Sequence, residues 1–103
     1  MISKKGGSPM TLSVKQISDR LSTLENWEIN EDGAIQKRYP FDQYLSGVEF
    51  SSAIANEAQR RTHYPVILIN ADSVMIKIKA DDTKGLTEAD FALAHAAERI
   101  YYS

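Results

Sequence analysis

The change of hydrophobic period at Pro65 constrains the fold more than any other feature of the sequence. Before it, apolar and small residues recur at helical spacing from about residue 43 to residue 61, which predicts a long helix. Pro65 cannot continue a helix, and it favours an extended backbone at Tyr64. Residues 66–69 are Val-Ile-Leu-Ile, a run typical of a strand. The segment 60–65 therefore predicts a junction between a helix and a strand.

The predicted helix at 43–61 should begin after Asp42, whose side chain can cap the first turn. Its expected buried stripe consists of small and apolar residues at helical spacing, widened by two larger side chains. The small residues would let the helix lie close to a sheet. The stripe comprises Leu45, Val48, Ser52, Ala55 and Ala58, with Phe50 and Ile54 beside them.

Alternating apolar and polar residues predict two hairpins, one on each side of this helix. The first pairs residues 27–30 with residues 34–41 across a turn in which Gly33 can take a positive φ. The second pairs residues 66–70 with residues 74–80. We therefore expect four strands.

Two further helices have clear start signals. Ser13 with Gln16, and Thr87 with Asp90, have the three-residue spacing of a capping box. The first of these helices should end near Leu24, and the second should run almost to the C-terminus. The order of elements then predicts an α+β fold with a four-stranded antiparallel sheet and three helices on one face.

Length and composition limit the organisation and the functional class. The 103 residues suit one domain at 11–103, and residues 1–10, rich in Gly and Ser, are expected to form a flexible tail. A net charge of −2 without a basic patch argues against nucleic-acid binding. The chain has no cysteine and no metal-ligand spacing, so we expect no disulfide and no metal. No apolar run is long enough to span a membrane, and we expect a cytoplasmic protein.

His63 is the candidate for acid–base chemistry, because imidazole exchanges protons near neutral pH and this one lies at the predicted helix–strand junction. The other histidine, His95, lies between alanines in the middle of a predicted helix. It is 32 positions away and forms no ligand motif with His63, so we expect it to be an ordinary helix residue.

From residue 35 onward the sequence resembles the pterin-4a-carbinolamine dehydratase family. His63-Tyr64-Pro65 occurs where that family has His-His-Pro, and residues 85–90 resemble its Gly-Leu-Ser/Thr-x-x-Asp motif. The spacing from residue 35 to residue 90 fits without a gap. The spaced aliphatic, basic and aromatic pattern that enters the long helix also matches, at Ile35, Lys37, Tyr39, Phe41 and Tyr44.

The resemblance implies a reaction and also shows a damaged site. Family enzymes dehydrate 4a-hydroxytetrahydropterin at C4a without a metal, using two adjacent histidines, a third histidine and a nearby charged residue. In this chain the first histidine is His63 and the proline is Pro65, but Tyr64 replaces the second histidine. Asp81 replaces the third, and Gln59 replaces the charged residue. No cofactor is implied.

Losing one positioned acid–base group typically lowers a rate by about 10²–10⁴-fold, and several such groups have changed together. The resemblance then favours a degenerate-site branch that acts as an assembly factor for the RuBisCO large subunit in the α-carboxysome system. Candidate partner-binding residues are Tyr39, Arg60, Arg61 and Tyr64, because tyrosines beside arginines are common in interfaces.

Two other interpretations remain open. The first is a divergent dehydratase that uses His63, Tyr64 and Asp81. The second, which we rank last, is a binding partner that controls the oligomeric state of a transcription factor, as in some family members. In every case we expect at least a dimer, because a single-layer sheet leaves one face and its edges unpaired.

Overall fold

The computed structural model describes residues 11–79 and 85–103 of the chain. The elements follow the predicted order, whereas the predicted tail at 1–10 lies outside the described residues. Their bounds are α1 (Val14–Leu21), β1 (Glu28–Ile29), β2 (Ile35–Pro40), α2 (Tyr44–Arg61), β3 (Val66–Asn70), β4 (Ser73–Ile78) and α3 (Glu88–Tyr101).

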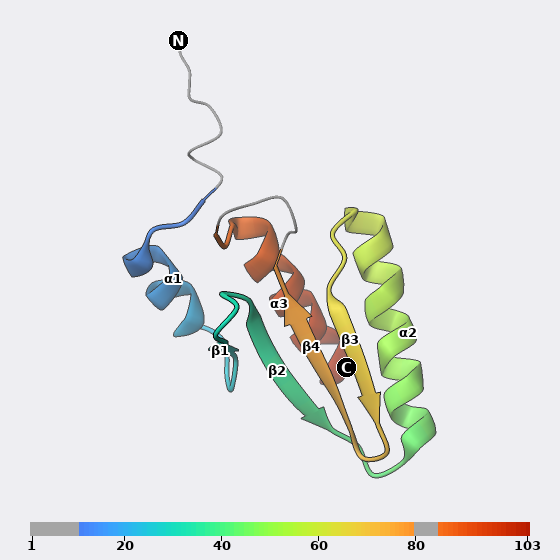
Figure 1. Cartoon of the computed structure of the whole chain (residues 1–103). Coiled ribbons are helices and arrows are strands. Elements are labelled where there is room, and N and C mark those ends of the chain that lie inside the picture. Colours follow the sequence, from blue (N-terminus) through green and yellow to red (C-terminus); the bar gives the residue numbers. More distant parts are fainter. Residues whose placement is uncertain (1–10, 80–84) are drawn as a thin grey trace.

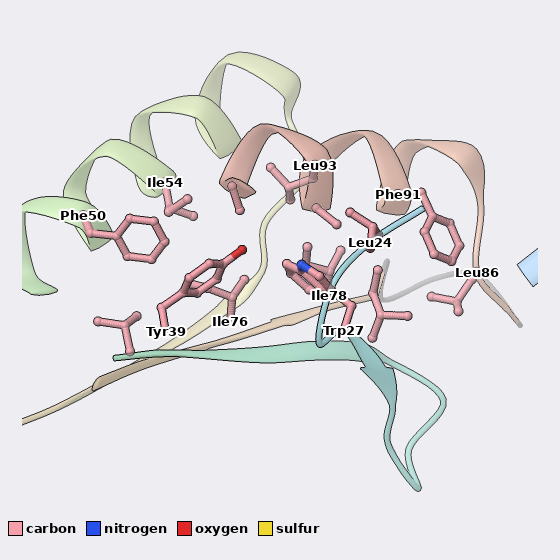
Figure 2. Packing of buried hydrophobic residues seen from close by; sticks show 14 of the residues in the cluster. Leu24, Trp27, Tyr39, Phe50, Ile54, Ile76, Ile78, Leu86, Phe91 and Leu93 are labelled. Atoms are coloured by element: carbon pink, nitrogen blue, oxygen red, sulfur yellow. The ribbon is translucent and has the colours of Figure 1, made fainter. Parts of the chain in front are cut away.

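The four strands form one antiparallel sheet in the order β1-β2-β4-β3 (Figure 1). The two hairpins meet in the middle, where β2 pairs with β4 from Ile35 opposite Ile78 to Pro40 opposite Ser73. Helices α2 and α3 lie over the same face of the sheet (Figure 2), and α1 packs Ile17 against the edge of the core. The predicted α+β class is confirmed.

The core lies between the sheet and the two long helices (Figure 2). The two-residue alternation predicted for the second strand is confirmed, because Ile35, Lys37 and Tyr39 are all buried on the covered face. Fully burying a large aliphatic side chain contributes about 1.5–3 kcal/mol. The largest fully buried apolar side chains are Tyr39, Ile35, Ile54, Ile76, Ile78, Leu93 and Val74.

The buried stripe predicted for α2 is wrong for Leu45, Ser52 and Ala55, which are exposed. The residues that α2 buries are instead Gly47, Phe50, Ser51, Ile54 and Ala58. Gly47 explains the choice of face, because a Cβ at this position would lie 3.1 Å from Cγ2 of Val74. A side chain here would force Val74 to shift by a few tenths of an ångström, so the glycine side of the helix fits closest to the sheet.

Several element ends also differ from the predictions. Helix α1 keeps its predicted capping box at Ser13 but ends at Leu21. The chain then turns through Asn26, whose φ is +66°, so that Leu24 becomes part of the core. The N-cap of α2 is Gln43 and not Asp42. None of the described helices is long and apolar enough to cross a membrane.

Candidate functional site

Helix α2 ends in a geometry that determines where His63 lies. Thr62 adopts the left-handed region at φ 53° and ψ 45°. The backbone N–H of His63 donates to the carbonyl of Ala58 at 3.0 Å, and the N–H of Thr62 donates to that of Gln59 at 3.1 Å. This pair of bonds is a Schellman motif, usually built with glycine at the left-handed position. The turn directs the chain from α2 into β3, with His63 at the corner.

His63 is held by a buried carboxylate from another helix. Its Nε2 lies 2.6 Å from Oδ1 of Asp90, and Asp90 is fully buried in the first turn of α3. The other carboxylate oxygen, Oδ2, accepts the backbone N–H of Thr87 at 2.8 Å and its hydroxyl at 3.3 Å. Asp90 therefore completes the predicted capping box and orients the imidazole as well.

The pair has the arrangement of a positioned acid–base group. A carboxylate on one ring nitrogen of histidine selects the tautomer and leaves the second nitrogen to exchange a proton. The His63 side chain is 15% exposed, so the ring is partly accessible to solvent. Nε2 is the ring nitrogen that contacts Asp90, and Nδ1 is therefore the nitrogen that a substrate would meet.

The other predicted site residues that the structure describes differ in their exposure. Tyr64 is 66% exposed, Gln59 is exposed on α2, and Pro65 is half-buried just before β3. Asp81 lies outside the described residues. Within residues 11–79 and 85–103, no group of three or more histidine, cysteine or acidic side chains is placed to hold a metal ion.

The predicted partner-binding residues divide into two groups. Arg60 is exposed and Arg61 is half-buried, and they share one carboxylate, because both guanidinium groups donate to Oε2 of Glu57, at 2.5 and 2.6 Å. These hydrogen bonds, first that of Arg60 and then that of Arg61, lower the pKa of Glu57. Tyr39, the remaining candidate for partner binding, does not reach the surface. Tyr39 is fully buried and packs in the core against Phe50.

A second carboxylate of α3 anchors Tyr39. Oε2 of Glu98 accepts the Tyr39 hydroxyl, the Lys37 ammonium at 2.8 Å and the Trp27 indole N–H at 3.2 Å. Burial would raise the pKa of Glu98, but the hydrogen bonds from Lys37, Tyr39 and Trp27 outweigh it and lower the value. Burial, with the bond to Glu98, raises the pKa of Tyr39 far above its usual range. This cluster cross-links β2 to α3.

The sequence interpretation missed one residue of the site. It assigned Asp90 a capping role only, because nothing in a separation of 27 positions from His63 indicates contact. The usable signal was the joint presence of His63 and of the Gly-Leu-Thr-x-x-Asp motif at 85–90. When a chain keeps two motifs of a family at the ends of elements that pack together, the two motifs are candidates for one site.

Comparison with known proteins gives a consistent result. The family model described as Pterin 4 alpha carbinolamine dehydratase matches residues 10–100. A Rickettsia bellii protein with the provisional name pterin-4-alpha-carbinolamine dehydratase is 37% identical over 91 residues, which cover 87% of this chain and 80% of that protein. A Paracidovorax citrulli protein with the same provisional name is 31% identical over 100 residues, which cover 91% of this chain and 86% of that protein.

A solved structure supports the fold. The crystal structure of a transcriptional coactivator/pterin dehydratase from Brucella melitensis superposes with a TM-score of 0.83. The match covers 88% of this chain and 98% of the other chain, at 21% sequence identity. At this level of identity the likeness establishes the architecture.

Proposed function

The chain belongs to the pterin 4 alpha carbinolamine dehydratase family, and on this basis we propose that it dehydrates a 4a-hydroxytetrahydropterin with His63 as its acid–base group. The observation that supports the proposal is the 2.6 Å contact between Nε2 of His63 and the buried carboxylate of Asp90. The carboxylate holds the imidazole in one orientation and leaves its other nitrogen, Nδ1, for proton exchange.

The reaction requires proton transfer at two places. The bond between C4a and the hydroxyl oxygen breaks, and the hydroxyl leaves as water after it gains a proton. A ring N–H loses its proton as the carbon–nitrogen double bond forms. An imidazole that alternates between its two protonation states can serve either transfer, and Asp90 keeps its ring in one orientation. The exposed Tyr64 hydroxyl supplies a second group with an exchangeable proton on the same loop.

The decisive experiment compares two histidine variants. We expect purified protein to accelerate the absorbance change of a freshly generated 4a-hydroxytetrahydropterin, and we expect His63→Ala to lose about 10²–10⁴-fold in rate. His95→Ala is the matched control, because it removes the other imidazole, whose Nε2 is 3.3 Å from the Thr23 hydroxyl. Equal rates for the two variants would refute the role of His63, and an inactive wild-type protein would refute the reaction.

A second candidate function is assembly of the RuBisCO large subunit, with association to the α-carboxysome. Tyr64 favours it, since an exposed tyrosine stands where the family has its second imidazole, close in sequence to Arg60 and Arg61. Tyrosine and arginine are enriched in protein interfaces. The test is the yield of folded RuBisCO with and without the protein. An increase that Tyr64→Ala removes and His63→Ala keeps would support this function over the dehydratase.

We also propose that the chain forms at least a dimer. The edge strand β3 presents Val66, Leu68 and Ile69 as exposed apolar side chains, and an exposed apolar edge favours pairing with another strand. Light scattering coupled to size-exclusion chromatography should give a mass above the 11.5 kDa of one chain. A mass of one chain at all concentrations would contradict this proposal.

A further inference from the structure

A groove between the two long helices has no role in the proposed reaction. It has a volume of about 330 Å³ and is lined by Glu57, Arg60, Ala96, Arg99, Ile100 and Ser103. We call it the α2–α3 groove. It lies on the second half of α3, whereas Asp90 and His63 meet at the start of that helix. The groove is therefore separate from the candidate acid–base site.

The floor of the groove is apolar. Ala96 is buried and Ile100 is half-buried, and the small side chain at position 96 leaves the space between the helices open. The volume is at the lower end of the range for small-molecule sites, about 300–1,000 Å³. It suits a compact ring or a short aliphatic group and not a large ligand.

The rim carries an excess of positive charge. Glu57 is the carboxylate side chain that lines the groove, and Arg60 and Arg61 both donate to the same oxygen of it. Arg61 is not among the residues that line the groove, so within the lining this carboxylate balances the guanidinium group of Arg60. Arg99, on the other wall, is exposed and forms no ion pair with any of the residues that the structure describes.

We propose that the α2–α3 groove binds a small monocarboxylate with an apolar body. The apolar part would lie on Ala96 and Ile100, and the carboxylate would accept hydrogen bonds from Arg99 and Arg60. Arginine is suited to this task because its planar fork matches a carboxylate in two hydrogen bonds. Arg60 is already paired with Glu57, which leaves the single positive charge of Arg99, and one positive charge matches a monoanion better than a dianion such as a phosphate monoester.

The test is an NMR titration of the full chain at low salt with benzoate, benzamide and phenyl phosphate. Benzoate should bind with a dissociation constant in the millimolar range or below, and should shift the amide signals of residues 96–103. Benzamide, its neutral analogue, should bind at least about tenfold more weakly, because it lacks the charge-assisted hydrogen bonds. Phenyl phosphate should also bind more weakly than benzoate.

Two variants and one control locate the site. Arg99→Gln and Arg60→Gln should each weaken benzoate binding by about tenfold. Arg20→Gln is the matched control, because Arg20 is paired with Glu88 away from the groove. Three results would overturn the proposal: equal binding of benzoate and benzamide, tighter binding of phenyl phosphate, or benzoate binding that Arg99→Gln leaves unchanged.

Discussion

Two of the carboxylates on helix α3, Asp90 and Glu98, have different kinds of partner. Asp90, in its first turn, is fully buried and contacts the imidazole of His63. Glu98, two turns further on, accepts the ammonium of Lys37, the hydroxyl of Tyr39 and the indole of Trp27. The donors to Glu98 are an ammonium, a phenol and an indole, whereas Asp90 contacts an imidazole, the side chain type best suited to acid–base chemistry. The same helix thus contacts the candidate acid–base residue at one end and forms a cross-link to β2 at the other.

The position of each carboxylate along the helix explains part of this difference. A negative charge in the first turn is favoured by the helix dipole, and one near the last turn is not. The Asp90 carboxylate lies at the favourable end, and its Oδ2 accepts the backbone N–H of Thr87. Glu98 lies near the unfavourable end and accepts the charge of Lys37, which is only 5% exposed. Four measurements can test this difference between the two ends of α3, from the largest expected effect to the smallest.

Glu98→Ala should produce the largest loss of stability. It leaves the Lys37 ammonium buried without its carboxylate, and breaking a buried ion pair in this way typically costs about 3–5 kcal/mol. The free energy of unfolding from urea denaturation measures the loss. A double variant, Lys37→Met with Glu98→Leu, should recover most of it, because two apolar side chains can replace a buried ion pair. An unstable double variant with a stable Glu98→Ala would reverse our interpretation.

Asp90→Asn should affect activity more than Glu98→Gln does. Under the proposed function, the amide no longer fixes the imidazole of His63 by charge, and the rate should fall on the order of 10²-fold. The pH–rate profile should also change, which a purely structural defect would not cause. Thr87→Ala is the matched control, since it removes the hydroxyl that donates to Oδ2 and leaves the carboxylate beside His63. It should keep nearly the full rate.

Stability should fall on both sides of neutral pH because of the Glu98 cluster. The lowered pKa of Glu98 means that the unfolded chain binds its proton first, so stability is present above the usual value of about 4.3 and is lost as pH falls through the folded value. The raised pKa of Tyr39 means that the unfolded chain loses its proton first, so stability declines as pH rises above about 10.

Two variants distinguish the loss of stability at acid pH from the loss at alkaline pH. Glu98→Gln should flatten the acid limb of the plot of unfolding free energy against pH, and Tyr39→Phe should flatten the alkaline limb. Tyr44→Phe, which changes an exposed tyrosine at the start of α2, is the control for the alkaline limb and should leave it as it is. An alkaline limb that persists in Tyr39→Phe would exclude Tyr39 as its source.

Thr62→Gly should give the smallest effect, and it should stabilise the protein whereas Glu98→Ala destabilises it. The His63 end of the fold depends on a β-branched residue in the left-handed region, which costs about 1–2 kcal/mol relative to glycine, offset in part by the greater freedom of glycine in the unfolded chain. We expect a gain of about 0.5–1 kcal/mol in the free energy of unfolding, measured by urea denaturation. Thr62→Ala keeps the Cβ and should show no gain. A loss of stability in Thr62→Gly would mean that the threonine side chain contributes more than the strain removes.

The sequence was sufficient for the class of fold, because its signals are local. Alternation at residues 34–41 and 74–80, the two capping boxes and the change of period at Pro65 each depend on neighbours within a few positions. All of them predicted the right type of element. The α2 stripe shows where local signals fail, since both faces of that helix carry small and apolar residues. The buried face is the one that includes Gly47, which approaches Val74 closely.

The candidate site also has one residue that the sequence identified and one that only the structure showed. His63 was identifiable from the sequence, since imidazole chemistry depends on residue type and the junction at Pro65 is a local pattern. Its partner Asp90 was not, because that contact depends on which face of α3 meets the end of α2. That choice is made by packing between elements far apart in the chain, and only the tertiary structure contains it.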